Sequence, residues 1–161
     1  MRSSLQRAVR DRIISNNPCD NLGNIKPEER EIEFLTFEEI IQLSLHLPED
    51  ISSQQVAKMF LFSCYTGLSI ANLLSLTFKQ IEGDKVGFFR EKTKTWYYVE
   101  LNKTALALVG GTANCQPSAK VFTTLNYHQC LYRLQHWGKK AGIPKKINFH
   151  IGRNTFATLS L

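Results

Sequence analysis

The sequence predicts an α+β fold that is mainly helical and carries a small antiparallel β-hairpin or sheet. In most of its 161 residues, apolar side chains recur every three or four positions, as they do on one face of a helix. Only residues 79–101 change period, because two β-rich runs there are joined by a polar segment. Hydrophobic residues make up 43% of the chain, enough to build the core of one ordinary domain with or without a small appendage.

The chain is expected to begin with a short basic helix over residues 2–15, whose apolar side chains fall at every fourth position. An Asn-Asn-Pro run at 16–18 should end it, because the residue before a proline resists helical geometry. Residues 16–33 are polar and contain two prolines and a glycine, which is typical of a linker. The main domain is therefore expected at 34–161.

The first half of this domain is predicted to be helical. A Thr-x-x-Glu capping box at 36–39 indicates a helix over about 37–47. A second helix over about 53–66 has a wide apolar face, suited to a central position, and Gly67 can end it. Ser69 can then cap a short helix that follows.

The second half begins with the hairpin, whose strands are expected near 86–90 and 96–99. A helix over 103–109 follows, capped by the asparagine before it and ended by two glycines. A longer helix is predicted over 126–140, and a final one opens at 148–150 and continues to the last residue.

Charge and composition indicate which classes of partner and of protein are consistent with the sequence. Lys and Arg outnumber Asp and Glu by 20 to 14, giving a net charge of +6 and a pI near 9.2, which favours a polyanion. No apolar run approaches the roughly 20 residues of a membrane span, and no secretory signal is present. The four cysteines and four histidines are scattered, so free thiols and no metal site are expected.

The run from Phe149 to Thr158 is the first candidate site. His150 and Arg153 are three residues apart, so they share a helix face in the first turns, where free N–H groups favour an anion. Arginine offers two parallel donors to a phosphate, and histidine can donate or shuttle a proton. On its own, such a pair is more often a capping histidine and a solvated arginine.

The hairpin is the second candidate, because a lysine there can reach a DNA backbone or serve as a proton donor if its pKa is lowered. A solvated tip is the ordinary explanation of such charges. The segment Tyr65–Leu76 is the third candidate, although by itself it is only a helix–turn–helix corner. The charged hairpin residues are Lys85, Arg90, Lys92 and Lys94.

In order and context, these blocks resemble the catalytic domain of tyrosine recombinases, the phage-integrase family. The family reads approximately T-G-L-R-I-x-E-L-L-x-L, where this chain has T-G-L-S-I-A-N-L-L-S-L at 66–76. The family's hairpin lysine and V-P-L ending are matched by Lys92 and V-E-L at 99–101. Its F-x-x-H-x-L-R-H-T-F-A-T block is matched within residues 149–158, where the chain has H-I-G-R-N-T-F-A-T from His150 onward.

The resemblance covers nearly the whole chain and implies its domain organisation. The opening F-L-T-F-E-E-I of the main domain matches the usual start of the catalytic domain. Residues 1–15 are then the last helix of a core-binding domain, 16–33 a linker, and 34–161 an incomplete catalytic domain.

The resemblance also implies a reaction. Members of the family cut one DNA strand with a tyrosine, form a 3′-phosphotyrosyl link and free a 5′-hydroxyl, without metal or cofactor. Arg153 matches the family's second arginine, which clamps the scissile phosphate, and His150 matches the histidine that assists it. Lys92 aligns with the general acid for the departing 5′-oxygen. Three further residues are expected to contact DNA: Lys94 (also the fallback for Lys92, since hairpin alignments slip by two), Arg90 and Ser69.

Two departures bear on activity. Ser69 stands where the first arginine is expected, and losing one charged contact should lower the rate on the order of 10²-fold. Some integrases of conjugative transposons look similar here, so inactivity does not follow. None of the tyrosines matches the nucleophile's place, and all precede the H-x-x-R block: Tyr65, Tyr97, Tyr98, Tyr127 and Tyr132. We therefore expect a truncated recombinase, inactive alone, whose nucleophile lies outside this chain.

Three functions remain open. The first is site-specific recombination or integration for a mobile element, and the second is the DNA-binding module of a decayed, inactive integrase. The third is a plain helical interaction domain in which the charge is incidental. The resemblance implies double-stranded DNA as the partner, a tetramer on DNA for the full protein, and a cytoplasmic location at the nucleoid.

Overall fold

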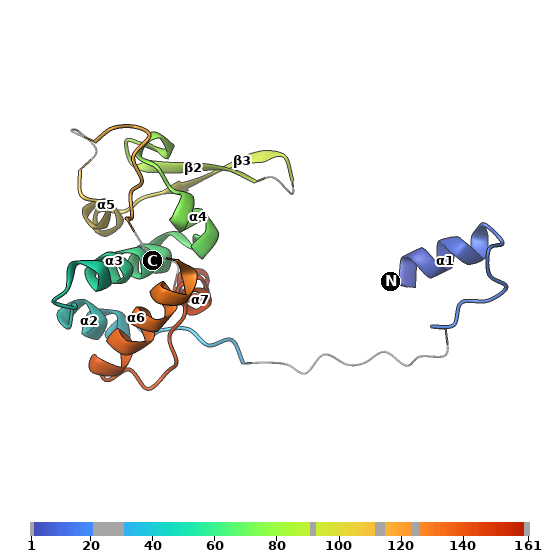
Figure 1. Cartoon of the computed structure of the whole chain (residues 1–161), viewed down its shortest axis with the longest axis horizontal. Coiled ribbons are helices and arrows are strands. Elements are labelled where there is room, and N and C mark those ends of the chain that lie inside the picture. The colour runs from blue at the N-terminus through green and yellow to red at the C-terminus, as the bar shows by residue number, and fades with distance from the viewer. Residues whose placement is uncertain (1, 21–30, 91–92, 112–114, 124–125, 160–161) are drawn as a thin grey trace. The chain divides into compact units, whose positions relative to one another are not determined.

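The computed structural model describes residues 2–20, 31–90, 93–111, 115–123 and 126–159. The chain divides into two compact units, Met1–Glu31 and Ile32–Leu161. The larger unit is mainly helical and holds a small antiparallel sheet, so the predicted α+β class is confirmed (Figure 1). None of its described helices is long and apolar enough to cross a membrane.

The first unit contains the helix α1, Arg2–Arg10, which is shorter than the predicted 2–15. The helix ends because Arg12 adopts a left-handed φ of 56° and its N–H bonds to the carbonyl of Val9 at 3.0 Å. The backbone therefore leaves the helix well before the proline that was expected to stop it. A turn follows, in which the Asn17 side chain donates to Asp20 at 2.8 Å.

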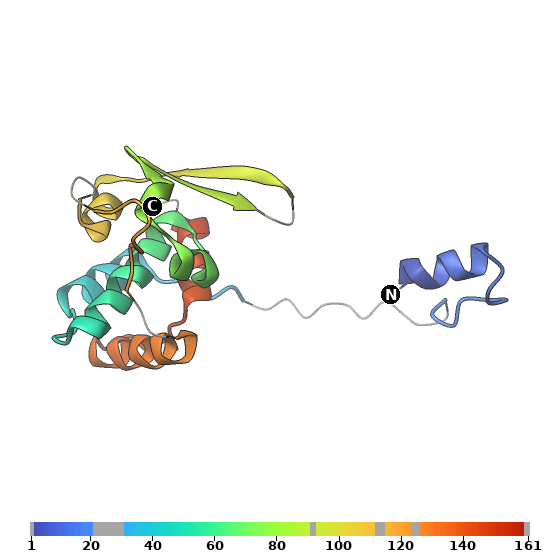
Figure 2. The same ribbon diagram turned by 45° about the horizontal axis from the view of Figure 1, so that its top comes forward.

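The larger unit is built around α3. Its helices are α2 (Phe37–Leu45), α3 (Ile51–Thr66), α4 (Ile70–Ser75), α5 (Lys103–Val109), α6 (Tyr127–Lys140) and α7 (Phe149–Leu159). The helix α3 packs against α5, α6 and α7, and Phe60 at its centre meets Trp137 and Phe149 edge to face at 6.2 and 6.0 Å. Figures 1 and 2 show the sheet on one side of α3, with α2 and α6 on the other.

Several predicted helix boundaries in the larger unit are confirmed, namely those where a capping side chain or a glycine determines the boundary. Thr36 and Glu39 form the reciprocal capping box that starts α2. Gly67 ends α3 in the left-handed conformation at φ 68°, and Ser69 caps α4. The start of α3 lies two residues before the predicted one, because Asp50 caps it by accepting the N–H of Ser53.

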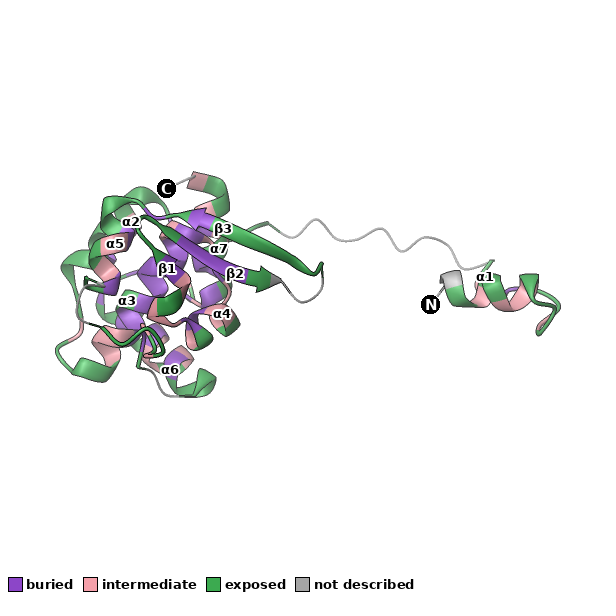
Figure 3. Ribbon diagram, turned by 90° about the horizontal axis from the view of Figure 1, so that it is seen from above, coloured by how far each residue is buried: buried purple, intermediate pink, exposed green. Residues whose placement is uncertain are grey.

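The predicted hairpin is part of a three-stranded antiparallel sheet in the order β1 (Ile81–Glu82), β2 (Lys85–Arg90), β3 (Thr95–Glu100). The sequence did not reveal the two-residue strand β1. The register pairs Val86 with Val99 and Phe89 with Trp96. Figure 3 shows that much of β2 is buried whereas most of β3 is exposed, so the sheet has one packed face and one open face.

Candidate functional site

The start of α7 is set by an asparagine cap. The Asn148 side-chain oxygen accepts the backbone N–H groups of His150 and Ile151 at 2.9 and 3.0 Å. The helix therefore begins at Phe149, and His150 and Arg153 lie in its first turns with exposed side chains. This is the arrangement that the H-x-x-R spacing predicted.

Buried contacts hold α7 in place. Thr155 Oγ1 accepts the N–H of Leu35 at 2.9 Å and donates to the carbonyl of Ile151 at 2.8 Å. One residue before Arg153, a Cβ at Gly152 would lie 3.2 Å from both Phe60 Cε2 and Ser63 Oγ, so the backbone approaches α3 closely. These two contacts of the buried face of α7 fix the position of the Arg153 backbone.

The corner between α3 and α4 lies against the same helix. The Ser63 hydroxyl donates to the carbonyl of Leu68 at 2.9 Å, which closes the turn around Gly67. The Phe156 ring of α7 occupies the space over Gly67, since a Cβ there would lie 2.5 Å from its Cδ1. This contact brings Ser69, at the start of α4, next to the first turns of α7.

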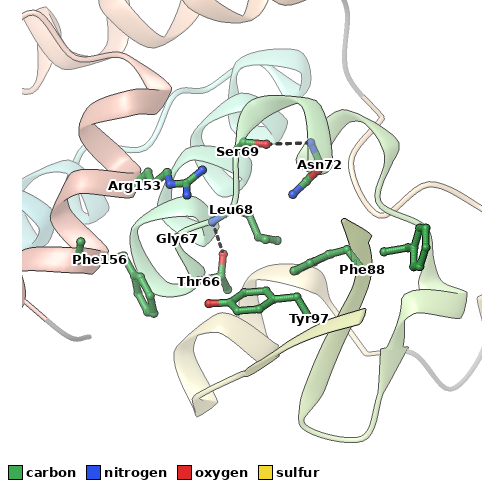
Figure 4. Close-up of a pocket in the computed structure, with 11 residues that line it drawn as sticks. Thr66, Gly67, Leu68, Ser69, Asn72, Phe88, Tyr97, Arg153 and Phe156 are labelled. Carbon is green, nitrogen blue, oxygen red and sulfur yellow. Dashed lines mark hydrogen bonds between the residues drawn. The ribbon is translucent and has the colours of Figure 1, made fainter. Parts of the chain in front are cut away.

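Two hollows lie where these elements meet. The first, called here the central hollow, has a volume of about 460 Å³, and Figure 4 shows α4 and α7 on one side of it and the hairpin on the other. It is lined by Thr66, Gly67, Leu68, Ser69, Asn72, Phe88, Phe89, Tyr97, Arg153, Phe156 and Ala157. The second, the side hollow, has about 180 Å³ and is lined by Ser69, Ile70, Tyr127, Asn148, Phe149, His150 and Arg153. Ser69 and Arg153 belong to both.

The side hollow is a favourable place for an anion. The first residues of three helices line it: Ile70 of α4, Tyr127 of α6 and Phe149 of α7. Helix N-termini carry partial positive charge, which favours an anion bound near them. Among the described residues, the side chains of His150 and Arg153 make no hydrogen bond or ion pair, so both can bind a ligand.

The hairpin candidates are placed only in part. Lys92 lies outside the described residues. Arg90 ends β2 with its backbone paired to Thr95, and its side chain is not described. Lys94 sits just before β3 with a left-handed φ of 52°. The structure therefore brings Ser69, His150 and Arg153 together, whereas neither Lys85 nor Lys94 lines the two hollows.

The structure adds residues to the site that were not predicted: Asn72, Tyr97, Tyr127 and Phe156. The block T-G-L-S-I-A-N contains one signal, because Asn72 stands where the quoted family pattern has a glutamate. Tyr97 and Tyr127 enter the site only through the packing of β3 and α6, for which the sequence carries no local signal.

Titration and metal binding can also be judged from the geometry. Burial raises the pKa of the Cys64 thiol, and it also raises the pKa of the Tyr65 hydroxyl, so both groups stay protonated near neutral pH.

In the described part of the chain, no group of three or more His, Cys, Asp or Glu side chains is arranged to hold a metal ion.

The fold matches several solved structures of DNA-acting enzymes. The XerA recombinase superposes with a TM-score of 0.62 at 19% identity, over 80% of this chain and 50% of XerA. The Tn1549 transposon integrase, bound to circular intermediate DNA, gives 0.65 at 19% identity, over 98% of this chain and 62% of the integrase. The XerH site-specific recombinase, bound to a palindromic difH substrate, gives 0.65 at 16% identity, over 91% of this chain and 48% of XerH.

The chain thus spans between about half and under two thirds of the length of these structures. No model of a protein family and no curated protein sequence matches it. The superpositions nevertheless cover 80%, 98% and 91% of this chain. The chain therefore has a tyrosine recombinase/integrase-like fold.

Proposed function

We propose that this protein binds double-stranded DNA and takes part in site-specific recombination or integration for a mobile element. The observation that carries the proposal is the meeting of Arg153, His150 and Ser69 at adjoining hollows, where three helix N-termini converge. A guanidinium that pairs with none of the described residues, next to a histidine at such a place, suits a backbone phosphate. The DNA-bound state of the solved structures it resembles is consistent with this ligand.

In the proposed reaction, a tyrosine hydroxyl gives up its proton to solvent as its oxygen attacks the scissile phosphorus and forms a 3′-phosphotyrosyl bond. The bond to the 5′-oxygen breaks, and that oxygen takes a proton and leaves as a hydroxyl. Arg153 would neutralise the charge on the non-bridging oxygens, His150 would donate a hydrogen bond to them, and Lys92 would protonate the leaving oxygen. We assign the nucleophile to a tyrosine outside residues 1–161.

Ser69 is proposed to contact the phosphate as a neutral donor. Its oxygen accepts the N–H of Asn72 at a long 3.4 Å, and its hydroxyl hydrogen is free to turn toward the hollow. The Asn72 carboxamide makes no hydrogen bond to the described residues and lines the same hollow. These two neutral groups stand where the family pattern has an arginine and a glutamate.

The remaining predictions follow the same scheme. We propose that residues 1–15 come from a core-binding domain, that 16–33 link it to a catalytic domain beginning at 34, and that Arg90 and Lys94 contact DNA. The full protein would assemble as a tetramer on DNA at the nucleoid. The alternative is an inactive DNA-binding module, which Ser69 favours, because a serine gives the transition state less charge than an arginine.

Binding by the chain itself tests the first part of the proposal. Wild-type protein should bind duplex DNA with a steep salt dependence, because phosphate contacts release counterions. Arg153→Ala should weaken binding roughly tenfold and make the dependence on salt shallower. Lys139→Ala removes a positive charge from an exposed position of α6 outside both hollows, and should change affinity much less.

Covalent chemistry tests the second part. A longer protein that includes the proposed nucleophile should form an adduct with a nicked suicide DNA substrate, and Arg153→Ala should abolish it. Absence of the adduct, with DNA binding intact, would favour the inactive module. An adduct formed by residues 1–161 alone and lost in Tyr97→Phe would show that the nucleophile had been assigned to the wrong place.

A further inference from the structure

The open face of the sheet carries three exposed aromatic side chains. Phe89, Trp96 and Tyr98, called here the aromatic platform, are 43%, 61% and 62% exposed. Their rings are adjacent: Phe89 and Trp96 have centroids 5.7 Å apart, and Trp96 and Tyr98 are nearly parallel at 6.2 Å. Figure 3 shows the ribbon of β3 mostly in the colour of exposed residues.

The fold does not account for these rings. The core is completed by the opposite face of the sheet, where Val86, Phe88 and Val99 are buried. Tyr98 lies across Gly87, because a Cβ at that glycine would be 2.9 Å from its ring. One side of the Tyr98 ring therefore rests on the strand while the other is open. A group of large aromatic side chains exposed in this way marks a binding surface.

The platform forms one wall of a third hollow, with a volume of about 690 Å³. The rest of the lining is mostly polar and includes Asn72, Ser75, Thr77 and Lys79, together with one carboxylate, Glu82. Neither the Asn72 carboxamide nor the Lys79 ammonium group bonds to another residue in the described ranges. The hollow thus offers π faces on one side and hydrogen-bond donors with a positive charge on the other.

This third hollow adjoins the central hollow. Asn72, Phe88 and Phe89 line both, so a strand with its phosphate at Arg153 has neighbouring nucleotides within reach of the platform. Every nucleobase can stack on an aromatic face, and base edges accept hydrogen bonds from amides and ammonium groups. Stacked bases inside a duplex offer no free face, so the surface suits unpaired ones.

We propose that the aromatic platform binds unpaired bases of a DNA strand whose phosphate lies in the central hollow. The inference rests on the proposed function, because cleavage and exchange of a strand leave bases transiently without partners. The occupant is nucleic acid rather than a protein because the platform continues into the proposed phosphate site, where Arg153 lies. Lys79 adds a positive charge at its border, whereas Lys85 is paired with Glu100 at 3.7 Å and Glu82 contributes one carboxylate.

Tryptophan fluorescence of the whole chain can report on this surface directly. The chain has two tryptophans, and Trp137 is 3% exposed with its indole N–H donated to the carbonyl of His46 at 2.6 Å. A change in emission upon binding DNA therefore reports Trp96. The probes are a fully paired duplex and one of equal length containing a short internal bubble of unpaired bases.

We expect the bubble duplex to quench Trp96 and to bind at least about fivefold more tightly than the paired duplex. Trp96→Leu and Tyr98→Leu keep apolar bulk on the sheet but have no π face, so each should remove most of this preference. The matched control is Tyr132→Leu, which removes an aromatic ring that is 73% exposed on α6 and should leave the preference unchanged. Circular dichroism melting establishes that the leucine variants are folded.

Two results would overturn the inference. One is an unchanged preference for the bubble in both leucine variants. The other is a Trp96 emission that shifts with protein concentration without DNA, since that would assign the platform to a second copy of the chain. If Arg153→Ala weakens binding to both probes while the leucine variants do not alter the preference, only this inference fails. If wild-type protein binds neither probe, the proposed function fails with it.

Discussion

The helix α7 and the β2–β3 hairpin face each other across the central hollow, yet they are held in different ways. The helix is fixed by a buried hydrogen bond from Leu35 to Thr155 and by close backbone packing of Gly152 on α3. The hairpin is packed on one face only, and its other face exposes Trp96 and Tyr98. Arg153, which would bind a phosphate, therefore lies on a helix that is packed against the core. Trp96 and Tyr98, which would contact a DNA strand, lie on a face of the sheet that no other part of the described structure covers. Substitutions under α7 should therefore change folding stability, and those on the open face of the hairpin should change binding alone.

The largest effect is expected at Phe60, which is fully buried between Trp137 and Phe149 under α7. Phe60→Ala should lower the free energy of unfolding by about 3–5 kcal/mol, because it removes a buried ring and leaves a cavity. Urea denaturation followed by circular dichroism measures the change. Phe37→Ala is the control, since Phe37 is half exposed and should contribute less than about 1 kcal/mol. Equal losses in the two variants would contradict the central role of α3.

A smaller loss is expected at Thr155. Thr155→Val keeps the shape and the helix propensity of the side chain but removes the acceptor for the Leu35 N–H. A buried donor without a partner costs about 1–3 kcal/mol of stability. Thr158→Val makes the same chemical change at an exposed position of α7, where the effect should stay within about 0.5 kcal/mol. If both variants melt like wild type, the segment before α2 does not anchor α7.

The parts of the molecule that could be predicted from sequence are those determined by residues close to one another in the chain. The capping box at Thr36 and Glu39, the stop at Gly67 and the caps at Ser69 and Asn102 were predicted because each depends on residues within one turn. The meeting of Ser69 with Arg153 came from the family resemblance and not from local pattern. Asn72 was missed although its place in the quoted family pattern gave a signal, whereas Tyr97 was missed because only the packing of distant elements places it at the hollow.

Errors in the prediction have local causes as well. The helix α1 ends at Arg10 because Arg12 adopts a left-handed backbone conformation. Glycine or asparagine usually occupies such a position, so an arginine there gave no signal in the sequence. The strand β1 has two residues, too few to show an alternating pattern. The β-rich composition of the hairpin residues predicted the strands correctly, but it could not tell that Trp96 and Tyr98 would be on the open face.

A gain in binding is expected when Ser69 is made to match the family pattern. Ser69→Arg places a second guanidinium beside Arg153, so DNA affinity should rise about tenfold. The slope of log affinity against log salt concentration should also become steeper, by about the amount expected for one additional phosphate contact. Stability should fall slightly, because the cap of α4 is lost. Ala71→Arg adds the same charge on an exposed position of α4 outside the hollows, and should have a much weaker effect on affinity. Equal gains in both variants would mean that the hollow is not where the phosphate binds.

The smallest effect concerns the pH dependence of the core that holds α7. Asp50 caps α3, and hydrogen bonds from the hydroxyl and the backbone N–H of Ser53 hold its pKa below the ordinary value, with a further contribution from Arg133. A carboxyl with a lowered folded-state pKa stabilises the protein fully above its unfolded-state pKa, about 3.9. This stabilisation is lost as the pH falls through the lower folded-state value. Asp50→Asn should therefore be less stable than wild type at neutral pH, and the difference should shrink as the solution is acidified.

Urea midpoints measured across this acid range test the expectation, with Glu49→Gln as the control. Glu49 is the adjacent carboxylate, is exposed, and its side chain bonds to none of the described residues, so its variant should run parallel to wild type at every pH. A difference between Asp50→Asn and wild type that stays constant down to the lowest pH would show that the charge of Asp50 does not stabilise the start of α3. In that case the cap would act through its hydrogen-bond geometry alone, which an asparagine reproduces only in part.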